Sequence, residues 1–425
     1  MPAGVYIHIP FCKSRCSYCD FATDVFRNDE AVKRYVNALI DEIRIQKSEV
    51  RSQEGKGKSK KEKSESPDQP GRSSLATHHS SLSDSHSVLS PQSSVLHAGR
   101  VCFDTIYFGG GTPSLLSPDQ LGPILEAVRD RFDIADDAEI TVEMNPATVS
   151  LEQLKDYLAF GVNRASFGVQ TFDDRSLKLL ARGHDADDAR KTYDLLREAG
   201  FKNISFDLIA GLPHQTLEGW KANIEEAVAM SPEHISLYLL EIHEGTPLAE
   251  QVRSGRQPMP DEDLAAEMYE AMLERLDAAG YLQYEISNFS REGRESRHNL
   301  KYWELEPVIG FGVSAHSFDG SRRWINVRDT FAYVKSVECG DSPVVEIDEL
   351  PEKQLKAEFA FLKLRLNKGL DLREYRERFG SGLLEEFGEE LEEFRKAGLL
   401  EVSGTSVSLT NRGRLYSNEV FGVFV

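Results

Sequence analysis

The chain alternates short apolar runs with amphipathic stretches, and this alternation restricts its fold more than any other feature. The apolar runs have the character of buried strands, while the stretches between them carry apolar residues at i, i+3 and i+4. Six strand–helix units in succession predict an α/β fold with a parallel sheet and right-handed crossovers. The predicted strands are Val5–Ile9, Thr105–Phe108, Ile140–Met144, Ala165–Val169, Ile204–Ile209 and Ile235–Leu240. The predicted helices are Ala31–Ile45, Pro118–Phe132, Leu151–Phe160, Asp187–Ala199 and Leu217–Met230.

One serine-rich segment interrupts the alternation. Between Ser52 and Ala98, 14 of 47 residues are serine and only six are leucine or valine. Such a composition cannot bury enough apolar surface to offset the entropy of ordering, so we expect residues 48–100 to be a disordered insertion. Its histidines are either solvated spacer residues or a weak metal or heme site: His78, His79, His86 and His97.

The pattern changes after residue 260, which indicates three parts: the strand–helix unit 1–260, an extension 261–345 and a C-terminal unit 346–425. The C-terminal unit combines helices with two short strands and looks like a small winged-helix domain. The acidic run 385–390 makes DNA binding an unsuitable role, so we expect packing or partner contact instead. The predicted elements are helices Leu264–Ala279, Lys353–Leu366, Leu372–Phe379 and Leu383–Ala397, and strands Leu399–Val402 and Val407–Thr410.

Charge and cysteine usage limit the class of protein. The formal net charge is −20, which argues against sequence-independent binding of nucleic acid. No run of about 18 apolar residues occurs, so we expect no membrane span. Strand-like sequence starts at Val5 and leaves no room for a signal peptide. Cys102 and Cys339 are isolated and give no disulfide framework, so we expect a cytoplasmic protein.

Three further cysteines, Cys12, Cys16 and Cys19, follow the first predicted strand with the spacing C-x3-C-x2-C. Three thiolates on one loop can hold three irons of a [4Fe–4S] cluster and leave the fourth iron open to a small chelating ligand. Structural zinc is the alternative, but it requires four closed protein ligands. The loop adds only His8 and Asp20, and neither completes a usual zinc spacing.

Polar residues and glycines follow the other predicted strands. In a parallel sheet, ligands bind at the carboxyl ends of the strands, so these residues should gather at one edge. Each one alone is compatible with a strand-end cap or a surface ion pair, but together with the cysteines they indicate a ligand site. They are the turn Gly109-Gly110-Gly111-Thr112-Pro113, Glu143, Gln170, Arg182 and Asp207.

These features resemble the radical S-adenosylmethionine (SAM) superfamily, in which SAM chelates the fourth iron. Four segments are similar to its coproporphyrinogen dehydrogenase-like branch: 6–12, 108–113, 166–170 and 207–213. The resemblance covers nearly the whole chain except the insertion. It implies a partial (β/α)6 TIM-type barrel with SAM held at the mouth. The SAM-contacting positions that it implies are Tyr6, Gly110, Gly111, Thr112, Glu143, Gln170, Arg182 and Asp207.

Two functions occur in that branch. The oxygen-independent coproporphyrinogen III dehydrogenases carry a fourth cysteine two residues after the third, where this chain has Phe21. Their N-terminal extension is also missing here. Both departures are similar to the HemW-type heme chaperones, and so is the segment Arg297–Trp303, which contains H-N-x-x-Y-W. This resemblance implies a heme-binding protein that passes heme to an acceptor protein, by analogy a membrane-associated respiratory one.

Two histidines are candidates for a heme ligand, because imidazole is a common axial ligand of heme iron. The resemblance favours His298 over its alternative role as a buried support of the barrel wall. His316 lies in a glycine-rich segment that more simply shapes a loop near the barrel mouth. We expect a chaperone without porphyrinogen oxidase activity. A dehydrogenase that uses radical SAM chemistry is the competing hypothesis, and a partner-binding module with a vestigial cluster is a third.

Overall fold

The computed structural model describes residues 2–25, 28–54 and 102–424. Its main feature is a twelve-stranded sheet, in the order β14-β13-β12-β11-β1-β4-β5-β6-β7-β8-β10-β9. The six strands predicted from the sequence form its centre and pair in parallel. They are β1 (Ala3–Ile9), β4 (Cys102–Gly110), β5 (Asp133–Met144), β6 (Arg164–Gln170), β7 (Ile204–Ala210) and β8 (His234–Leu239).

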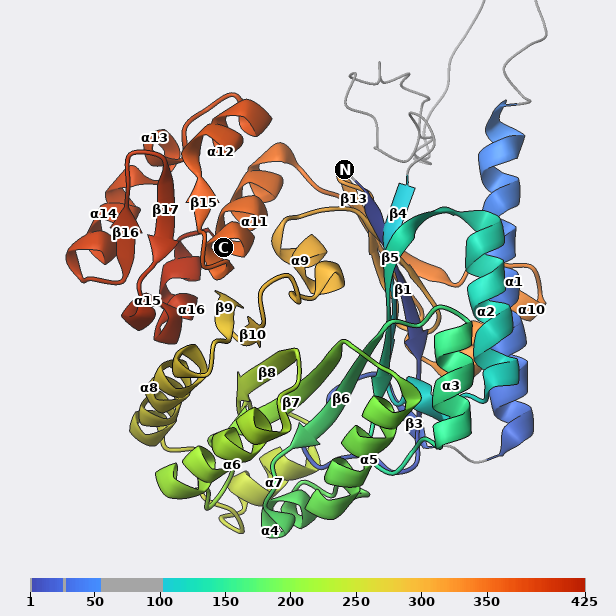
Figure 1. The fold of residues 1–425 in the computed structure, drawn as a ribbon. Helices are drawn as coiled ribbons and strands as arrows, with labels where there is room; N and C mark the ends of the chain where they lie inside the picture. Colours follow the sequence, from blue (N-terminus) through green and yellow to red (C-terminus); the bar gives the residue numbers. More distant parts are fainter. Residues whose placement is uncertain (1, 26–27, 55–101, 425) are drawn as a thin grey trace, which may run out of the picture.

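Helices follow these strands and cover one face of the curved sheet (Figure 1). They are α1 (Asp29–Glu54), α2 (Pro118–Arg131), α3 (Leu151–Ala159), α4 (Asp174–Leu179), α5 (Ala186–Ala199) and α6 (Leu217–Met230). Ser117 caps the start of α2, and its backbone N–H donates to Gln120 Oε1 over 2.9 Å. Gly200 ends α5 with a φ of 111°, a left-handed conformation that suits glycine.

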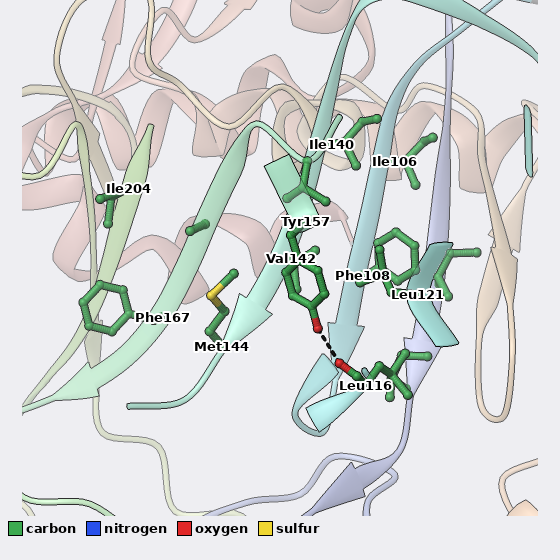
Figure 2. Packing of buried hydrophobic residues seen from close by; sticks show 14 of the residues in the cluster. Ile106, Phe108, Leu116, Leu121, Ile140, Val142, Met144, Tyr157, Phe167 and Ile204 are labelled. Atoms are coloured by element: carbon green, nitrogen blue, oxygen red, sulfur yellow. Dashed lines mark hydrogen bonds between the residues drawn. The ribbon is translucent and has the colours of Figure 1, made fainter. Parts of the chain in front are cut away.

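The face toward these helices is apolar because alternate residues of each strand point to it. Figure 2 shows Ile106, Phe108, Val142 and Phe167 among the buried side chains on this side. Tyr157 of α3 closes the layer and donates to the carbonyl of Leu116 over 2.6 Å. The opposite, concave face is called the inner face below. The six-stranded arrangement with outer helices confirms the predicted partial barrel.

Strands that the sequence did not resolve extend the sheet on both sides. β11 (Val308–Phe311) pairs in parallel with β1, whereas the other added strands pair antiparallel. These are β9 (Leu282–Glu285), β10 (Asn288–Ser290), β12 (His316–Phe318), β13 (Arg322–Asn326) and β14 (Val344–Glu349). The helices of this region are α7 (Pro247–Arg253), α8 (Glu262–Ala278), α9 (Arg297–Trp303) and α10 (Thr330–Glu338). α9 lies against the inner face (Figure 1).

The C-terminal unit has its own apolar core and a three-stranded sheet in the order β15-β17-β16. Its chain order of helix, strand, helices and two strands agrees with the predicted winged-helix-like domain. The elements are α11 (Glu352–Arg365), β15 (Leu370–Asp371), α12 (Leu372–Phe379), α13 (Leu383–Glu386), α14 (Gly388–Lys396), β16 (Leu400–Val402) and β17 (Ser406–Leu409). Two short helices, α15 (Asn411–Leu415) and α16 (Ser417–Phe421), and the 3-10 turn Gly422–Phe424 end the chain.

Several element boundaries differ from the prediction, and β5, for example, begins at Asp133 rather than at Ile140. α1 continues to Glu54 rather than ending near Ile45, because the polar residues that follow Ile45 are compatible with helical backbone. The expected helix over 383–397 is split at Phe387, whose ψ of 13° is not helical and whose ring packs 4.9 Å from that of Phe424. The predicted insertion 48–100 lies outside the described residues from 55 onward, and so do its four histidines. The boundaries 1–260, 261–345 and 346–425 stay predictions.

Candidate functional site

The three cysteines lie on the loop between β1 and α1, at the carboxyl edge of the parallel strands. Two residue pairs frame this loop, β2 (Phe11–Cys12) and β3 (Asp24–Val25), which pair in parallel. All three thiols are half-buried. Burial raises the pKa of the Cys12 thiol to about 11, and burial also raises the pKa of Cys19. Metal binding to these thiols would therefore release protons, because the ligand is the thiolate.

A chain of polar contacts joins two of the cysteines to neighbouring strand ends. Thr112 Oγ1 donates to Cys12 Sγ over 3.6 Å and accepts from Asn145 Nδ2 over 2.7 Å. The Arg182 guanidinium donates to Asn145 Oδ1, and its Nη1 lies 3.5 Å from Cys16 Sγ. Arg182 also donates to the carbonyl of Gly168 over 2.9 Å. The structure thus brings the predicted residues Thr112 and Arg182 directly against the cysteine loop.

The glycine turn after β4 fits against the same loop only because it lacks side chains. Gly110 has a φ of 109°, and a Cβ there would lie 2.6 Å from the His8 ring. A Cβ on Gly111 would lie 2.7 Å from the backbone carbonyl of Pro10. The backbone N–H groups of Gly111 and Thr112 instead donate to Ile9 and Phe11 over 2.7 and 2.8 Å. Close backbone approach, rather than flexibility, is the role of these glycines.

His8 links β1 to the far end of the cysteine loop. Its Nε2 lies 2.9 Å from the carbonyl of Ala22 and its Nδ1 lies 3.1 Å from the Tyr6 hydroxyl. These partners fit a neutral ring that donates from Nε2 and accepts at Nδ1. Burial lowers the pKa of His8, which agrees with the neutral form. Tyr6 stands on the inner face and is half-buried, and its contact with SAM stays a prediction.

Glu143 lies on the inner face and is half-buried. It is the residue before Met144, the last residue of β5. Its Oε1 accepts from the Tyr107 hydroxyl over 2.7 Å, and its Oε2 accepts from the backbone N–H of Gly110 over 3.1 Å. Burial raises the pKa of Glu143 to about 7, and the nearby Asp207 carboxylate contributes. A carboxyl with this pKa can accept or give up a proton near neutral pH.

Gln170 and Asp207 complete the set of predicted SAM positions. Gln170 ends β6 with a φ of 67°, an uncommon value for a residue with a side chain, and it is 9% exposed. Asp207 is a half-buried residue of β7 that pairs with Ser236 of β8. Burial raises the pKa of Asp207. Every predicted SAM residue therefore belongs to the inner face or to the edge that carries the cysteines.

The donor set fits a [4Fe–4S] cluster with one open iron. Three soft sulfur ligands stand on one loop, and polar groups that fit the termini of an amino acid are adjacent. Within residues 2–25, 28–54 and 102–424, no group of three His, Cys, Asp or Glu side chains is arranged around a single metal ion. That arrangement is not what a cluster requires, because each cysteine binds a different iron of the cluster.

His298 is buried at the floor of the inner face. It is 1% exposed, its Nδ1 lies 2.8 Å from Thr105 Oγ1, and its Nε2 lies 3.3 Å from the Tyr302 hydroxyl. Its ring stacks on Tyr107 and Tyr6 at centroid distances of 5.0 and 6.4 Å. Burial lowers its pKa to about 3. In this arrangement both ring nitrogens of His298 have hydrogen-bond partners, so neither is free to bind iron. Heme ligation by His298 stays a prediction, and it requires α9 to move.

The other residues named with His298 differ in exposure. Tyr302 is 40% exposed, whereas His298 is 1% exposed. The Trp303 ring instead lies under the guanidinium of Arg365 in the C-terminal unit, and Arg365 Cζ is 4.4 Å from the centroid of that ring. His316 is exposed at the start of β12, near enough to His8 to lower the pKa of His8.

Sequence reasoning missed two contributors to the site, Asn145 and Tyr107. Asn145 comes directly after β5 and bridges Thr112 to Arg182. Asn145 follows a predicted strand directly, and this position could have indicated from the sequence that it belongs to the site. Tyr107 holds Glu143, but it lies within an apolar run, where only the register of the sheet reveals that it faces inward.

Two family models match the chain. Residues 88–227 match the radical SAM superfamily, and residues 350–416 match the HemN C-terminal domain. Among solved structures, coproporphyrinogen III oxidase (HemN) from Escherichia coli, a radical SAM enzyme, aligns with a TM-score of 0.76 at 23% identity. The alignment covers 100% of this chain and 90% of that one, and it establishes a shared fold.

Curated relatives extend over the full length. The chain is 34% identical to the protein named heme chaperone HemW from Bacillus subtilis, over 99% of each chain. It is also 34% identical to the protein of that name from Mycobacterium tuberculosis, over 99% of this chain and 94% of the relative. A mouse protein, radical S-adenosyl methionine domain-containing protein 1, mitochondrial, is 35% identical over 74% of this chain and 60% of its own. The chain therefore belongs to the HemW family of radical SAM proteins.

Proposed function

We propose that this protein is a heme chaperone, which binds heme and passes it to an acceptor protein. The observation that carries the proposal is the 34% identity to a named heme chaperone over 99% of both chains. Phe21 supports it, because this side chain stands where the related dehydrogenases carry a fourth cysteine, and it is 68% exposed on the loop. We place the protein in the cytoplasm. In the described part of the chain, no helix is long and apolar enough to cross a membrane.

A [4Fe–4S] cluster on Cys12, Cys16 and Cys19, with SAM at the open iron, belongs to this proposal. Such a bound pair supplies one-electron chemistry in radical SAM enzymes. In this chain, Arg182 and the glycine turn would hold the polar termini of SAM, and Tyr107 would orient Glu143 toward them. Because Thr112 and Arg182 contact the thiols directly, SAM binding and cluster geometry should depend on each other.

The cluster is tested by iron and sulfide analysis after anaerobic reconstitution. We expect about four irons per chain, and C16S should lose most of them. C339S is the matched control, because Cys339 is exposed and distant in sequence from the loop, and it should keep its iron. One zinc per chain without sulfide would contradict the assignment.

We place heme on the inner face, which carries exposed tyrosine side chains. Tyr238 of β8 and Tyr302 of α9 are 42% and 40% exposed there, and both rings are large enough to pack on a porphyrin. The acceptor is a protein, which we propose is respiratory and membrane-associated. His298 remains the candidate axial ligand if α9 is displaced, and His316 is the next candidate.

One assay separates the chaperone from the dehydrogenase, which shares the fold. Reconstituted protein is incubated anaerobically with SAM, a reductant and coproporphyrinogen III, and release of CO2 is measured beside a hemin titration. The chaperone predicts saturable hemin binding with no CO2 release. Release of CO2 from the propionate side chains would instead identify a dehydrogenase.

A further inference from the structure

Arg164 is a buried guanidinium that none of the contacts above explains. It begins β6, where its neighbours Ala165, Phe167 and Val169 are fully buried in the core beneath the outer helices. Because side chains alternate along a strand, Arg164 points to the inner face. It is only 1% exposed.

Among the described residues, the Arg164 side chain has no hydrogen bond and no ion pair. Its Nε is fully buried and without an acceptor. The buried lysines of this protein are different: Lys301 Nζ lies 2.6 Å from Asp104 Oδ1, and Lys363 Nζ lies 2.8 Å from Glu374 Oε1. A buried cation without a direct partner is unfavourable, so the Arg164 guanidinium has unused capacity to bind an anion through hydrogen bonds.

The carboxyl groups nearest in the sheet are already engaged. Both oxygens of Glu143 accept hydrogen bonds, from Tyr107 and from Gly110, and neither is within ion-pair distance of Arg164. Asp207 is likewise not paired with it. The charge of Arg164 acts on this whole region. Burial lowers the pKa of His234 and His298, and Arg164 lowers both further. Burial raises the pKa of Glu143 and Asp207, and Arg164 partly offsets that rise without a direct contact.

The depth of Arg164 separates it from the SAM positions. Arg164 pairs with Thr141, whereas Glu143 pairs with Ser166. The backbone of Arg164 therefore lies two residues farther than Glu143 from the edge that carries the cysteines. Two residues of a strand correspond to roughly 7 Å. The planar fork of an arginine matches a carboxylate with two parallel hydrogen bonds.

We infer that Arg164 binds a carboxylate of the ligand on the inner face, which under the proposed function is a propionate of the tetrapyrrole. This inference rests on the proposed function for the identity of the ligand. It assigns to Arg164 a role distinct from that of Arg182, which contacts the cysteine loop and, under the proposed function, would hold the carboxylate of SAM.

The test compares hemin with hemin dimethyl ester, in which both propionates are neutral, on the reconstituted full chain. R164M should weaken hemin binding at least about tenfold and leave binding of the ester and of SAM within twofold of wild type. R164K, which keeps the charge without the fork, should be intermediate. R275M is the matched control, because Arg275 pairs with Glu225 on the outer helices, and it should change nothing.

Three results of the binding assays would overturn the inference: unchanged hemin binding in R164M, an equal loss for hemin and its ester, or a loss of SAM binding alone. Thermal unfolding of the ligand-free protein gives a readout that does not need heme. R164M should match or exceed the wild-type midpoint, because it removes an unpaired buried charge. A lower midpoint would make Arg164 a structural counter-charge and contradict the inference.

A wild-type protein that binds no hemin would instead contradict the proposed function, and the unfolding midpoint of R164M would still test the role of Arg164.

Discussion

Two buried polar residues of α1 hold the backbone beside the cysteine loop. Tyr35 of α1 donates to the carbonyl of His8 over 2.8 Å and accepts from the N–H of Val313 over 3.0 Å. Two turns farther along the helix, Glu42 accepts from the N–H of Gly312 over 2.8 Å and from the Tyr333 hydroxyl over 2.6 Å. α1 thereby holds β1 and the glycine-rich segment after β11 in one arrangement.

Glu42 should make stability depend on pH. Burial raises its pKa from 4.5 to about 7, so the folded state holds the proton more tightly than the unfolded state. The stabilisation is complete below pH 4.5 and is lost as the pH rises through 7, by about 3 kcal/mol. E42Q does not titrate, so the difference in unfolding free energy between wild type and E42Q should shrink over this range in urea titrations. A difference that is constant from pH 4.5 to 8 would contradict the account.

Residues of the site differ in how well the sequence predicts them. The cysteines and the glycine turn were predictable because they follow apolar runs directly and have a local spacing. Arg164 was not, because it precedes an apolar strand and only the pairing with β5 shows which way it points. The burial of His298 also depends on contacts with Thr105 and Tyr302 that no local pattern encodes.

At the scale of elements, the site exists because two loops from neighbouring strands pack backbone against backbone. The glycine turn after β4 donates hydrogen bonds from Gly111 and Thr112 to the carbonyls of Ile9 and Phe11, where the cysteine loop begins. The six parallel strands were predictable from their apolar runs. β14 was not, because five of its six residues are exposed and it has no apolar periodicity.

G111A should separate the two loops. A Cβ at Gly111 would lie 2.7 Å from the Pro10 carbonyl carbon, so the turn must move away from the cysteines. We expect the variant to fold with reduced stability and to lose most of its iron after reconstitution. G404A is the control, because a Cβ there meets nothing within 4 Å, and it should keep wild-type iron content. Full iron content in G111A would show that the close approach is dispensable.

At the scale of the whole molecule, the C-terminal unit is joined to the barrel by charged contacts as well as apolar ones. Arg365 of α11 lies over the Trp303 ring of α9, and its Nη2 lies 3.4 Å from Glu285 Oε2 of β9. Glu285 is fully buried, and its Oε1 accepts from Ser287 and Asn288. This contact ties the segment that contains His298 to the C-terminal unit, so that movement of either would affect the other.

R365M should destabilise the whole chain, because it leaves the buried Glu285 carboxylate without its cation. Breaking a buried pair in this way costs roughly 3–5 kcal/mol. The double variant R365M/E285Q should recover part of that loss in urea unfolding, because the charge is removed with its partner. A double variant as unstable as the sum of the two single variants would contradict a direct interaction.

The central claim, that this chain binds heme as a chaperone, is tested most directly by a hemin titration of the anaerobically reconstituted protein followed by Soret absorption. The account predicts a saturable change near one heme per chain. It also predicts that the bound heme moves to an added apo-protein acceptor. Absence of saturable binding would contradict it.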